Sequence, residues 1–127
     1  MNANEIKFLE RSSYISFATR KRSGEWVATP VWFAPDKGSY YVFSAGAAGK
    51  VKRLRNFSES RIAACTMSGT LTGEWHDARA YVLDKPGDGD VALRALRRKY
   101  GWQMRLADFF SGLTGKLGRR AYIRIEP

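Results

Sequence analysis

The sequence is poor in the residues from which disulfides, metal sites and hydrolytic centres are built. Cys65 is the single cysteine and His76 the single histidine of 127 residues. One cysteine cannot form an intramolecular disulfide, and we expect it to be a buried thiol. One histidine and one cysteine are too few for a zinc site, no Gly-x-Ser-x-Gly sequence marks a nucleophile, and no two carboxylates stand out as an acid–base pair. We therefore expect no metal and name no catalytic residue; His76 is expected on a strand surface or at a pocket rim.

Long hydrophobic runs are also missing. None approaches the ~20 residues that a membrane-spanning helix needs. Lys7, Glu10 and Arg11 interrupt the N-terminal segment, so we expect no signal peptide. The hydrophobic content of 44% is nevertheless that of a folded protein. We expect one domain over residues 1–127, located in the cytoplasm.

Acidic residues are scarce relative to basic ones. The formal net charge is +10. An excess of this size favours an anionic partner, which in principle is a nucleic acid, a membrane surface or a polyanionic small molecule. The alternative is that the charge only keeps the protein in solution. The charge alone does not choose between these interpretations.

The pattern of apolar residues predicts an antiparallel β-barrel with inserted helices. Six short strands joined mostly by tight turns are expected, and strands do not alternate regularly with helices, which argues against a parallel sheet. A helix beginning near residue 91 is expected to be capped by Asp88 or Asp90. The expected strands are 14–20, 26–34, 40–44, 61–67, 75–83 and 120–125, and further helices are expected at 4–11, 50–56 and 104–110.

A glycine-rich loop from Ser44 to Gly49 leads into a short basic helix. On a helical wheel, Lys50 lies within the apolar arc of Val51, Leu54 and Phe57, where a buried cation would be costly. A lysine in the first turn can instead reach back to an anion at the helix N-terminus, and Arg53 one turn later can approach the same anion. The pattern therefore predicts a phosphate site, although a solvated surface helix is the alternative. It is not a Walker loop, because Val51 stands where that motif needs Ser or Thr.

Pro30 interrupts an otherwise regular strand. Proline removes one donor from the hydrogen-bond ladder, so it indicates an edge strand or a gap in the barrel. Thr29, Val31 and Trp32 flank this position with a hydroxyl group and two apolar surfaces. Such a gap suits a flat ligand, while the alternative is an edge proline that only prevents aggregation.

Together these segments resemble the split β-barrel flavin and deazaflavin oxidoreductases, the pyridoxamine 5′-phosphate oxidase-like family. The likeness lies in the order and spacing of 27–33, Ser44, 49–56, 72–75, 99–102 and 121–125, and is greatest to the branch that uses the deazaflavin called factor 420. It implies a homodimer with cofactor sites at the subunit interface, and a six-stranded FMN-binding split barrel. The cofactor-binding residues that it implies are Val27, Ala28, Thr29, Pro30, Val31, Trp32, Phe43, Ser44, Gly49, Lys50 and Arg53.

The chain departs from true pyridoxamine phosphate oxidases. Gly49 precedes Lys50 where those enzymes have arginine, and the ring-binding strand carries no basic residue. We also expect no counterpart of their substrate-binding C-terminal segment after Pro127. Vitamin B6 oxidation is therefore not expected.

The resemblance favours an oxidoreductase in which a bound deazaflavin, or alternatively FMN, exchanges hydride with a small conjugated substrate. Trp32 and Trp75 are expected to form walls around that substrate. Attraction of the deazaflavin's oligoglutamate tail by the basic surface, which includes Lys52, Arg55 and residues 94–99, supports the deazaflavin. The alternatives are an FMN enzyme, a non-catalytic flavin or haem carrier of the same fold and, third, a basic nucleic-acid-binding barrel. No nucleic-acid partner and no membrane span are expected.

Overall fold

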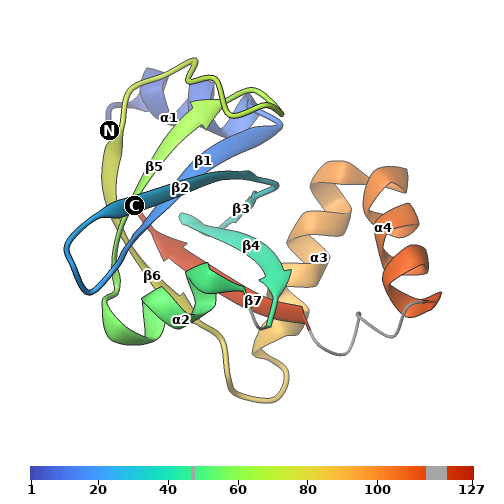
Figure 1. Ribbon diagram of the computed structural model, residues 1–127. Coiled ribbons are helices and arrows are strands. Elements are labelled where there is room, and N and C mark those ends of the chain that lie inside the picture. The colour runs from blue at the N-terminus through green and yellow to red at the C-terminus, as the bar shows by residue number, and fades with distance from the viewer. Residues whose placement is uncertain (47, 114–119) are drawn as a thin grey trace.

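The structure is a computed structural model that describes residues 1–46, 48–113 and 120–127. Within these residues the chain forms one curled antiparallel sheet with four helices around it (Figure 1). The strands are β1 (Tyr14–Arg20), β2 (Trp26–Val31), β3 (Ala34–Asp36), β4 (Ser39–Ala45), β5 (Glu59–Cys65), β6 (His76–Val82) and β7 (Arg120–Glu126). The helices are α1 (Ala3–Arg11), α2 (Gly49–Asn56), α3 (Asp88–Tyr100) and α4 (Trp102–Leu113). The predicted antiparallel barrel class is confirmed.

The interior of the sheet is built from alternate residues of each strand. Tyr40 and Val42 on β4 lie opposite Ile125 and Ile123 on β7, and all four are fully buried. This alternation is what a strand with one inward face produces, so period-two sequence patterns predicted these strands well. The same inward row of β1 contains Ile15 and Phe17 and ends at Thr19.

The expected strand over 26–34 is two strands, so the count is seven and not six. The break falls at Trp32 and Phe33, where the backbone leaves the ladder. The Phe33 N–H donates to the Tyr100 hydroxyl at 2.9 Å, and that hydroxyl lies 2.8 Å from the Phe33 carbonyl. A side chain of α3 thus pairs with the backbone N–H of Phe33 where the ladder is broken, which lets β2 end and β3 begin on the other edge of the sheet.

The sheet is open between its two edge strands. Its strand order is β2-β1-β5-β6-β7-β4-β3, so β2 and β3 are the edges, and the prediction from Pro30 of an edge strand is confirmed. The short β3 pairs only with the first part of β4, from Ser39 to Tyr41. In the described part of the chain, the rest of β4 therefore has a strand partner on its β7 side alone.

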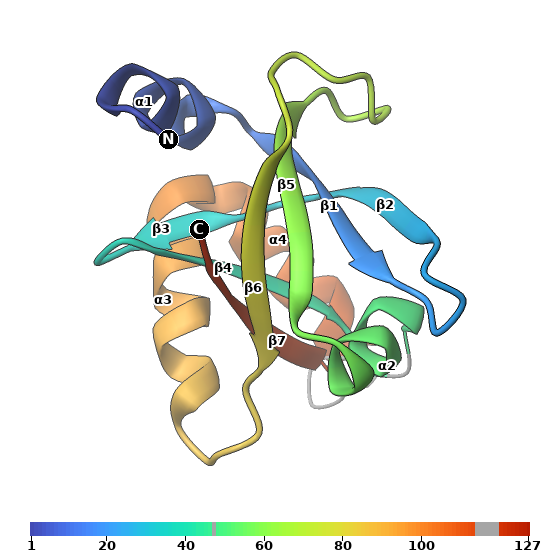
Figure 2. The ribbon, with the colours of Figure 1, turned by 90° about the vertical axis from the view of Figure 1, so that its left-hand side faces the viewer.

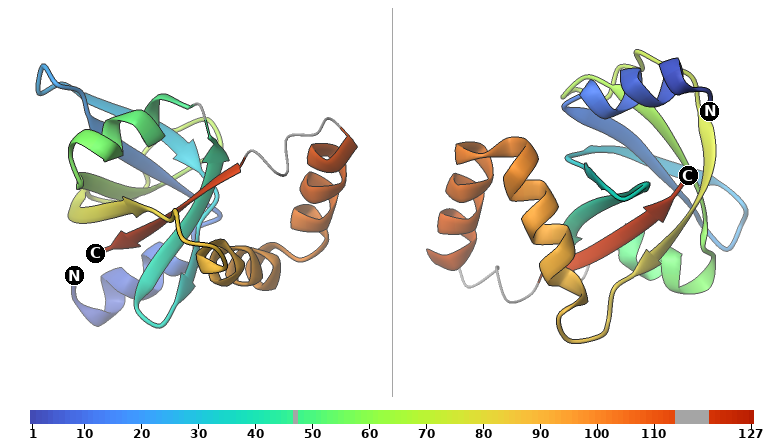
Figure 3. Two further views of the ribbon diagram at one scale, coloured as in Figure 1. Left: turned by 90° about the horizontal axis from the view of Figure 1, so that it is seen from below. Right: turned by 180° about the vertical axis from the view of Figure 1, so that it is seen from behind.

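The helices occupy different sides of the barrel. Helices α1 and α2 lie at opposite ends (Figure 2). Helix α3 packs against β3, β4 and β7, and α4 packs on α3, on the side away from the sheet (Figure 3). None of the helices among the described residues is long and apolar enough to cross a membrane.

The predicted cap of α3 is wrong. Its N-cap is Gly87, in the left-handed region at φ 87°, and no side chain caps the helix. Asp88 and Asp90 instead lie in the first turn, since the helix begins three residues earlier than the apolar pattern indicated. There they still complement the helix dipole.

Candidate functional site at the N-terminus of α2

The N-terminus of α2 is the most cationic helix start in the barrel. The N-cap residue Ala48 makes no side-chain capping bond, and the first turn holds no acidic residue. Val51 and Leu54 are buried in the core, while Lys52 and Asn56 are exposed, as the helical wheel predicted. The helix is therefore fixed by its apolar face, and its amide dipole is left to attract an anion.

Lys50 is half-buried in this first turn. Burial lowers the pKa of its ammonium group, and the neighbouring Arg53 lowers it further. Among the described residues, no carboxylate lies within ion-pair distance of Lys50 or Arg53. Two cations without a counter-ion at a helix N-terminus repel each other, and a bound anion would relieve that repulsion.

The guanidinium of Arg53 is held at the start of the helix. Its Nε donates to Thr19 Oγ1 at 2.6 Å, and Thr19 is fully buried on the inward row of β1. A Cβ atom on Gly49 would lie 2.6 Å from a terminal nitrogen of Arg53, so this guanidinium occupies the space that any side chain at position 49 would need. The loop glycine predicted before Lys50 is therefore explained by close approach rather than by backbone conformation.

Ser44 and β2 border the same end of the barrel. Ser44 is buried near the end of β4. Val27 on β2 lies opposite Thr19, so the register places this edge strand beside the hydroxyl that holds Arg53. The structure thus brings together Val27, Gly49 and Arg53 around Thr19.

Thr29 carries a further polar group on the edge strand. Its register partner is Phe17, which points into the core. Its Oγ1 is buried and has no hydrogen-bond partner among the described residues. Such an orphaned hydroxyl is a polar group that a bound molecule can satisfy. Ala28 and Pro30 alternate with Thr29 and are exposed on the opposite face of β2.

Trp32 and Phe43 lie in a second cluster, under α3. The Trp32 ring stacks on Tyr100 with a centroid distance of 4.6 Å. Trp32 and Phe43 pack in an edge-to-face arrangement with a centroid distance of 6.4 Å. The guanidinium of Arg120 lies 4.5 Å from the centre of the Phe43 ring. Both predicted aromatic residues therefore have packing partners on the outer face of the sheet.

Trp75 and His76 lie at the other end of the barrel. His76 begins β6, and its Nε2 is 3.8 Å from a carboxylate oxygen of Glu5 on α1. It borders a cavity there, which agrees with the rim position predicted for it. Trp75 precedes it and is 40% exposed. Since α1 and α2 are at opposite ends, the structure does not bring Trp75 to Lys50.

Two features near this site were not predicted from the sequence. One is the role of Thr19. It ends the inward series Ile15, Phe17, Thr19, so a hydroxyl at a position where an apolar side chain is expected was the available sequence signal. The other is a charge cluster in which Asp108 bridges Arg97 at 2.9 Å and Arg120 at 2.6 Å. This cluster had no sequence signal, because its members lie on α3, α4 and β7.

The residues present fit a phosphate-bearing ring cofactor. Lys50, Arg53 and the start of α2 supply a site for an anion, and the orphaned Thr29 hydroxyl on an open sheet edge supplies a polar contact for a ring. Alternate backbone groups of an edge strand also face away from the sheet and are available to a ligand.

The fold matches that of known split-barrel proteins. No family model matches the chain, and no curated protein matches it either. Among solved structures, HutZ, the haem storage protein of Vibrio cholerae, is 16% identical with a TM-score of 0.71, over 98% of this chain and 89% of that one. An FAD-binding protein of Mesorhizobium loti is 16% identical with a TM-score of 0.63, over 99% and 89%. A candidate pyridoxamine 5′-phosphate oxidase of Listeria innocua is 12% identical with a TM-score of 0.62, over 94% and 87%.

The chain thus has the pyridoxamine 5′-phosphate oxidase-like split-barrel fold. At these identities the likeness concerns the fold alone. The resemblance found in the sequence is confirmed at that level, whereas its deazaflavin branch stays a prediction.

Proposed function

We propose that this protein binds a phosphate-bearing deazaflavin, or alternatively FMN, and acts as an oxidoreductase on a small conjugated substrate. The observation that carries the proposal is the half-buried Lys50 at the uncapped start of α2, beside an Arg53 that Thr19 holds in place. A burial cost of this kind is sustained where an anion is bound, because the anion replaces the lost hydration.

The phosphate contacts are assigned to the end of the barrel at α2. Lys50 would act as the principal counter-charge and Arg53 as a second donor, while backbone amides of the first turn would complete the site. Ser44 lies at the adjoining end of β4. These groups are fixed by the fold, which lowers the entropic cost of binding.

The ring contacts are assigned to the edge strand β2. The Thr29 hydroxyl would donate to a ring oxygen or nitrogen, and the outward-facing backbone groups of residues 27–31 would contact the ring edge. When bound, the cofactor would supply hydride transfer at its central ring. The protein's own part is to bind and orient, which needs no side-chain base.

The choice of cofactor rests on charge. The net charge of +10 favours the oligoglutamate tail of the deazaflavin by long-range attraction. Some of the cations expected to contribute are engaged elsewhere, since Arg55 pairs with Asp84 at 2.9 Å and Arg97 pairs with Asp108. Lys52 stays exposed beside the site. The FAD-binding protein that shares this fold supports the flavin alternative.

A homodimer is part of the proposal. Helix α3 packs on β3, β4 and β7. Elsewhere on the sheet, Trp26 and Arg61 help to line a surface cavity of about 650 Å³. A second copy of the chain on an outer sheet face would border the open edge at β2. Sedimentation equilibrium measures the assembly directly, and a monomer at all concentrations contradicts this part.

The test is a fluorescence titration of the purified protein with the deazaflavin and with FMN. Wild type, Lys50→Ala and the matched control Lys52→Ala are compared, since both variants remove one lysine from the same helix. Loss of a charge-assisted contact of about 1.5–3 kcal/mol predicts roughly 10- to 150-fold weaker binding for Lys50→Ala only. Absence of binding by wild type, or equal binding by Lys50→Ala, contradicts the proposal.

A second candidate function is a non-catalytic carrier of a flavin or of haem. The structural likeness to a haem storage protein favours it. Cofactor binding without turnover on any acceptor of a panel of quinones, nitroaromatics and conjugated carbonyls would support the carrier. Oligonucleotide binding that weakens steeply with salt would instead support a nucleic-acid-binding barrel.

A further inference from the structure

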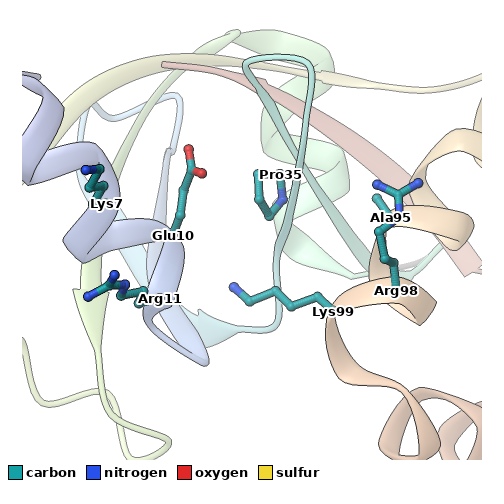
Figure 4. A pocket seen from close by; sticks show the side chains of 7 residues that line it. All are labelled: Lys7, Glu10, Arg11, Pro35, Ala95, Arg98 and Lys99. Carbon is teal, nitrogen blue, oxygen red and sulfur yellow. The ribbon is translucent and has the colours of Figure 1, made fainter.

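A second cationic cavity lies at the end of the barrel remote from α2. It has a volume of about 310 Å³ and opens between α1, β3 and α3 (Figure 4). Lys7 and Arg11 line it from α1, and Arg98 and Lys99 line it from α3. The phosphate and ring contacts proposed above use none of these residues.

The cations of this cavity are incompletely neutralised. Arg98 lies 3.7 Å from Asp36, whereas Lys7, Arg11 and Lys99 have no carboxylate within ion-pair distance among the described residues. The one acidic residue that lines the cavity, Glu10, accepts a hydrogen bond from the Tyr40 hydroxyl at 3.1 Å. The cavity therefore keeps a positive potential after its own carboxylate is counted.

Lys99 is the most constrained of these cations. Its Nζ donates to the Ser12 carbonyl at 2.8 Å and lies 3.5 Å from the centre of the Phe33 ring. In Figure 4 its side chain extends from α3 toward α1. Burial lowers the pKa of this ammonium group to about 8, and Glu10 partly opposes that shift. An anion close to Lys99 would raise the pKa again, because it stabilises the charged form.

Apolar groups complete the cavity. Pro35 on β3 and Ala95 on α3 line it together with the methylene stems of the long basic side chains. Long basic side chains present an apolar stem and a charged tip, so such a cavity offers apolar walls beneath a cationic rim. An ion without an apolar part would use the rim and leave the walls in water.

We propose that this cavity is a second ligand site, which takes a small carboxylate with a compact apolar body such as an aromatic acid. The carboxylate would lie between Arg11 and Lys99, and the body would pack on Pro35 and Ala95. This inference does not depend on the function proposed for the α2 site.

The test uses benzoate as the probe and amide chemical shifts of the isotope-labelled full chain as the readout. Sodium benzoate replaces sodium chloride at constant ionic strength, so that general salt effects cancel. We expect saturable shifts confined to residues 7–12, 34–36 and 95–99. Acetate is expected to bind at least about threefold more weakly, since it buries less apolar surface.

Variants distinguish benzoate binding at this cavity from a general effect of the protein's net charge. Arg11→Gln removes an exposed cation of the rim and is expected to weaken benzoate binding about fivefold or more. Lys52→Gln removes the same charge from α2 and is expected to leave it unchanged. Lys99→Met is a second test, with folding checked by circular dichroism. Shifts that do not saturate, equal binding of acetate and benzoate, or equal effects of Arg11→Gln and Lys52→Gln would each overturn the proposal.

Discussion

Thr19 Oγ1 accepts a hydrogen bond of 2.6 Å from Arg53 Nε, and this contact joins two residues that are 34 positions apart in the chain. Thr19 is fully buried on β1, whereas Arg53 lies on the helix that closes one end of the barrel. A buried hydroxyl that fixes an arginine orients the whole guanidinium, because Nε anchors one edge of that planar group. The remaining nitrogens are then presented beside Gly49.

Replacing Thr19 with valine should therefore weaken anion binding without removing a charge. The two side chains are similar in volume, but valine cannot accept from Arg53. We expect roughly three- to tenfold weaker FMN binding and about 1–2 kcal/mol lower stability, since a buried hydrogen bond is lost. Fluorescence titration and urea unfolding measure the two effects. Thr72→Val, at an exposed position, is the control, and unchanged affinity in Thr19→Val would refute the anchoring role.

Gly49→Ala should separate binding from stability. The added Cβ would meet the end of the Arg53 side chain at 2.6 Å, so the guanidinium must shift and its hydrogen bond to Thr19 would be weakened. Alanine nevertheless favours the helix at this position. We expect an unfolding free energy within about 0.5 kcal/mol of wild type but clearly weaker cofactor binding.

A double-mutant cycle with Arg53→Ala checks the Gly49 prediction. In the Arg53→Ala background there is no guanidinium to displace, so Gly49→Ala should then have no further effect on affinity. Additive losses would show that the methyl group blocks the ligand directly instead of acting through Arg53.

Tyr100→Phe should destabilise the protein through the break between β2 and β3. The Tyr100 hydroxyl accepts from the Phe33 N–H and also lies 2.8 Å from the Ser13 carbonyl. Phenylalanine would leave a buried backbone N–H unpaired, which costs about 1–3 kcal/mol. Urea unfolding measures the loss, and Tyr81→Phe, at an exposed side chain, is the matched control. Equal midpoints for Tyr100→Phe and wild type would contradict this account.

The separation of Tyr100 from Phe33 along the chain also explains why the sequence did not predict the break between β2 and β3. The strand patterns of residues 14–20 and 120–126 depend only on local alternation, and these strands were predicted with nearly the correct bounds. The break at Phe33 depends on a hydroxyl 67 residues later, which no window of sequence contains. The predicted six strands became seven for that reason.

The site shows the same division between local and distant causes. The position of Lys50 within an apolar arc followed from the helical period, and the structure places it half-buried in the first turn. The role of Thr19 depends on which strand α2 covers. The Trp32 ring stacks on Tyr100, a neighbour on α3 that the sequence order does not reveal, and its expected place beside a substrate stays a prediction.

Lys99 should make stability depend on pH in a defined window. The pKa of Lys99 is lowered from an ordinary value of 10.5 to about 8, chiefly by burial. Between these two values the unfolded chain binds the proton and the folded chain does not, so stability rises with pH across the window from 8 to 10.5. Below pH 8 both states are charged, and the full burial cost is present.

Lys99→Met isolates this contribution, because the other titrating groups stay in both proteins. Lys50 shifts in the same direction, whereas burial raises the pKa values of Tyr100 and Cys65, which opposes the rise at high pH. We expect the difference in urea midpoint between wild type and Lys99→Met to change in favour of wild type from pH 8 toward pH 10, and to be constant from pH 6 to 7. A difference that is the same at every pH would show that Lys99 is not desolvated in the folded protein.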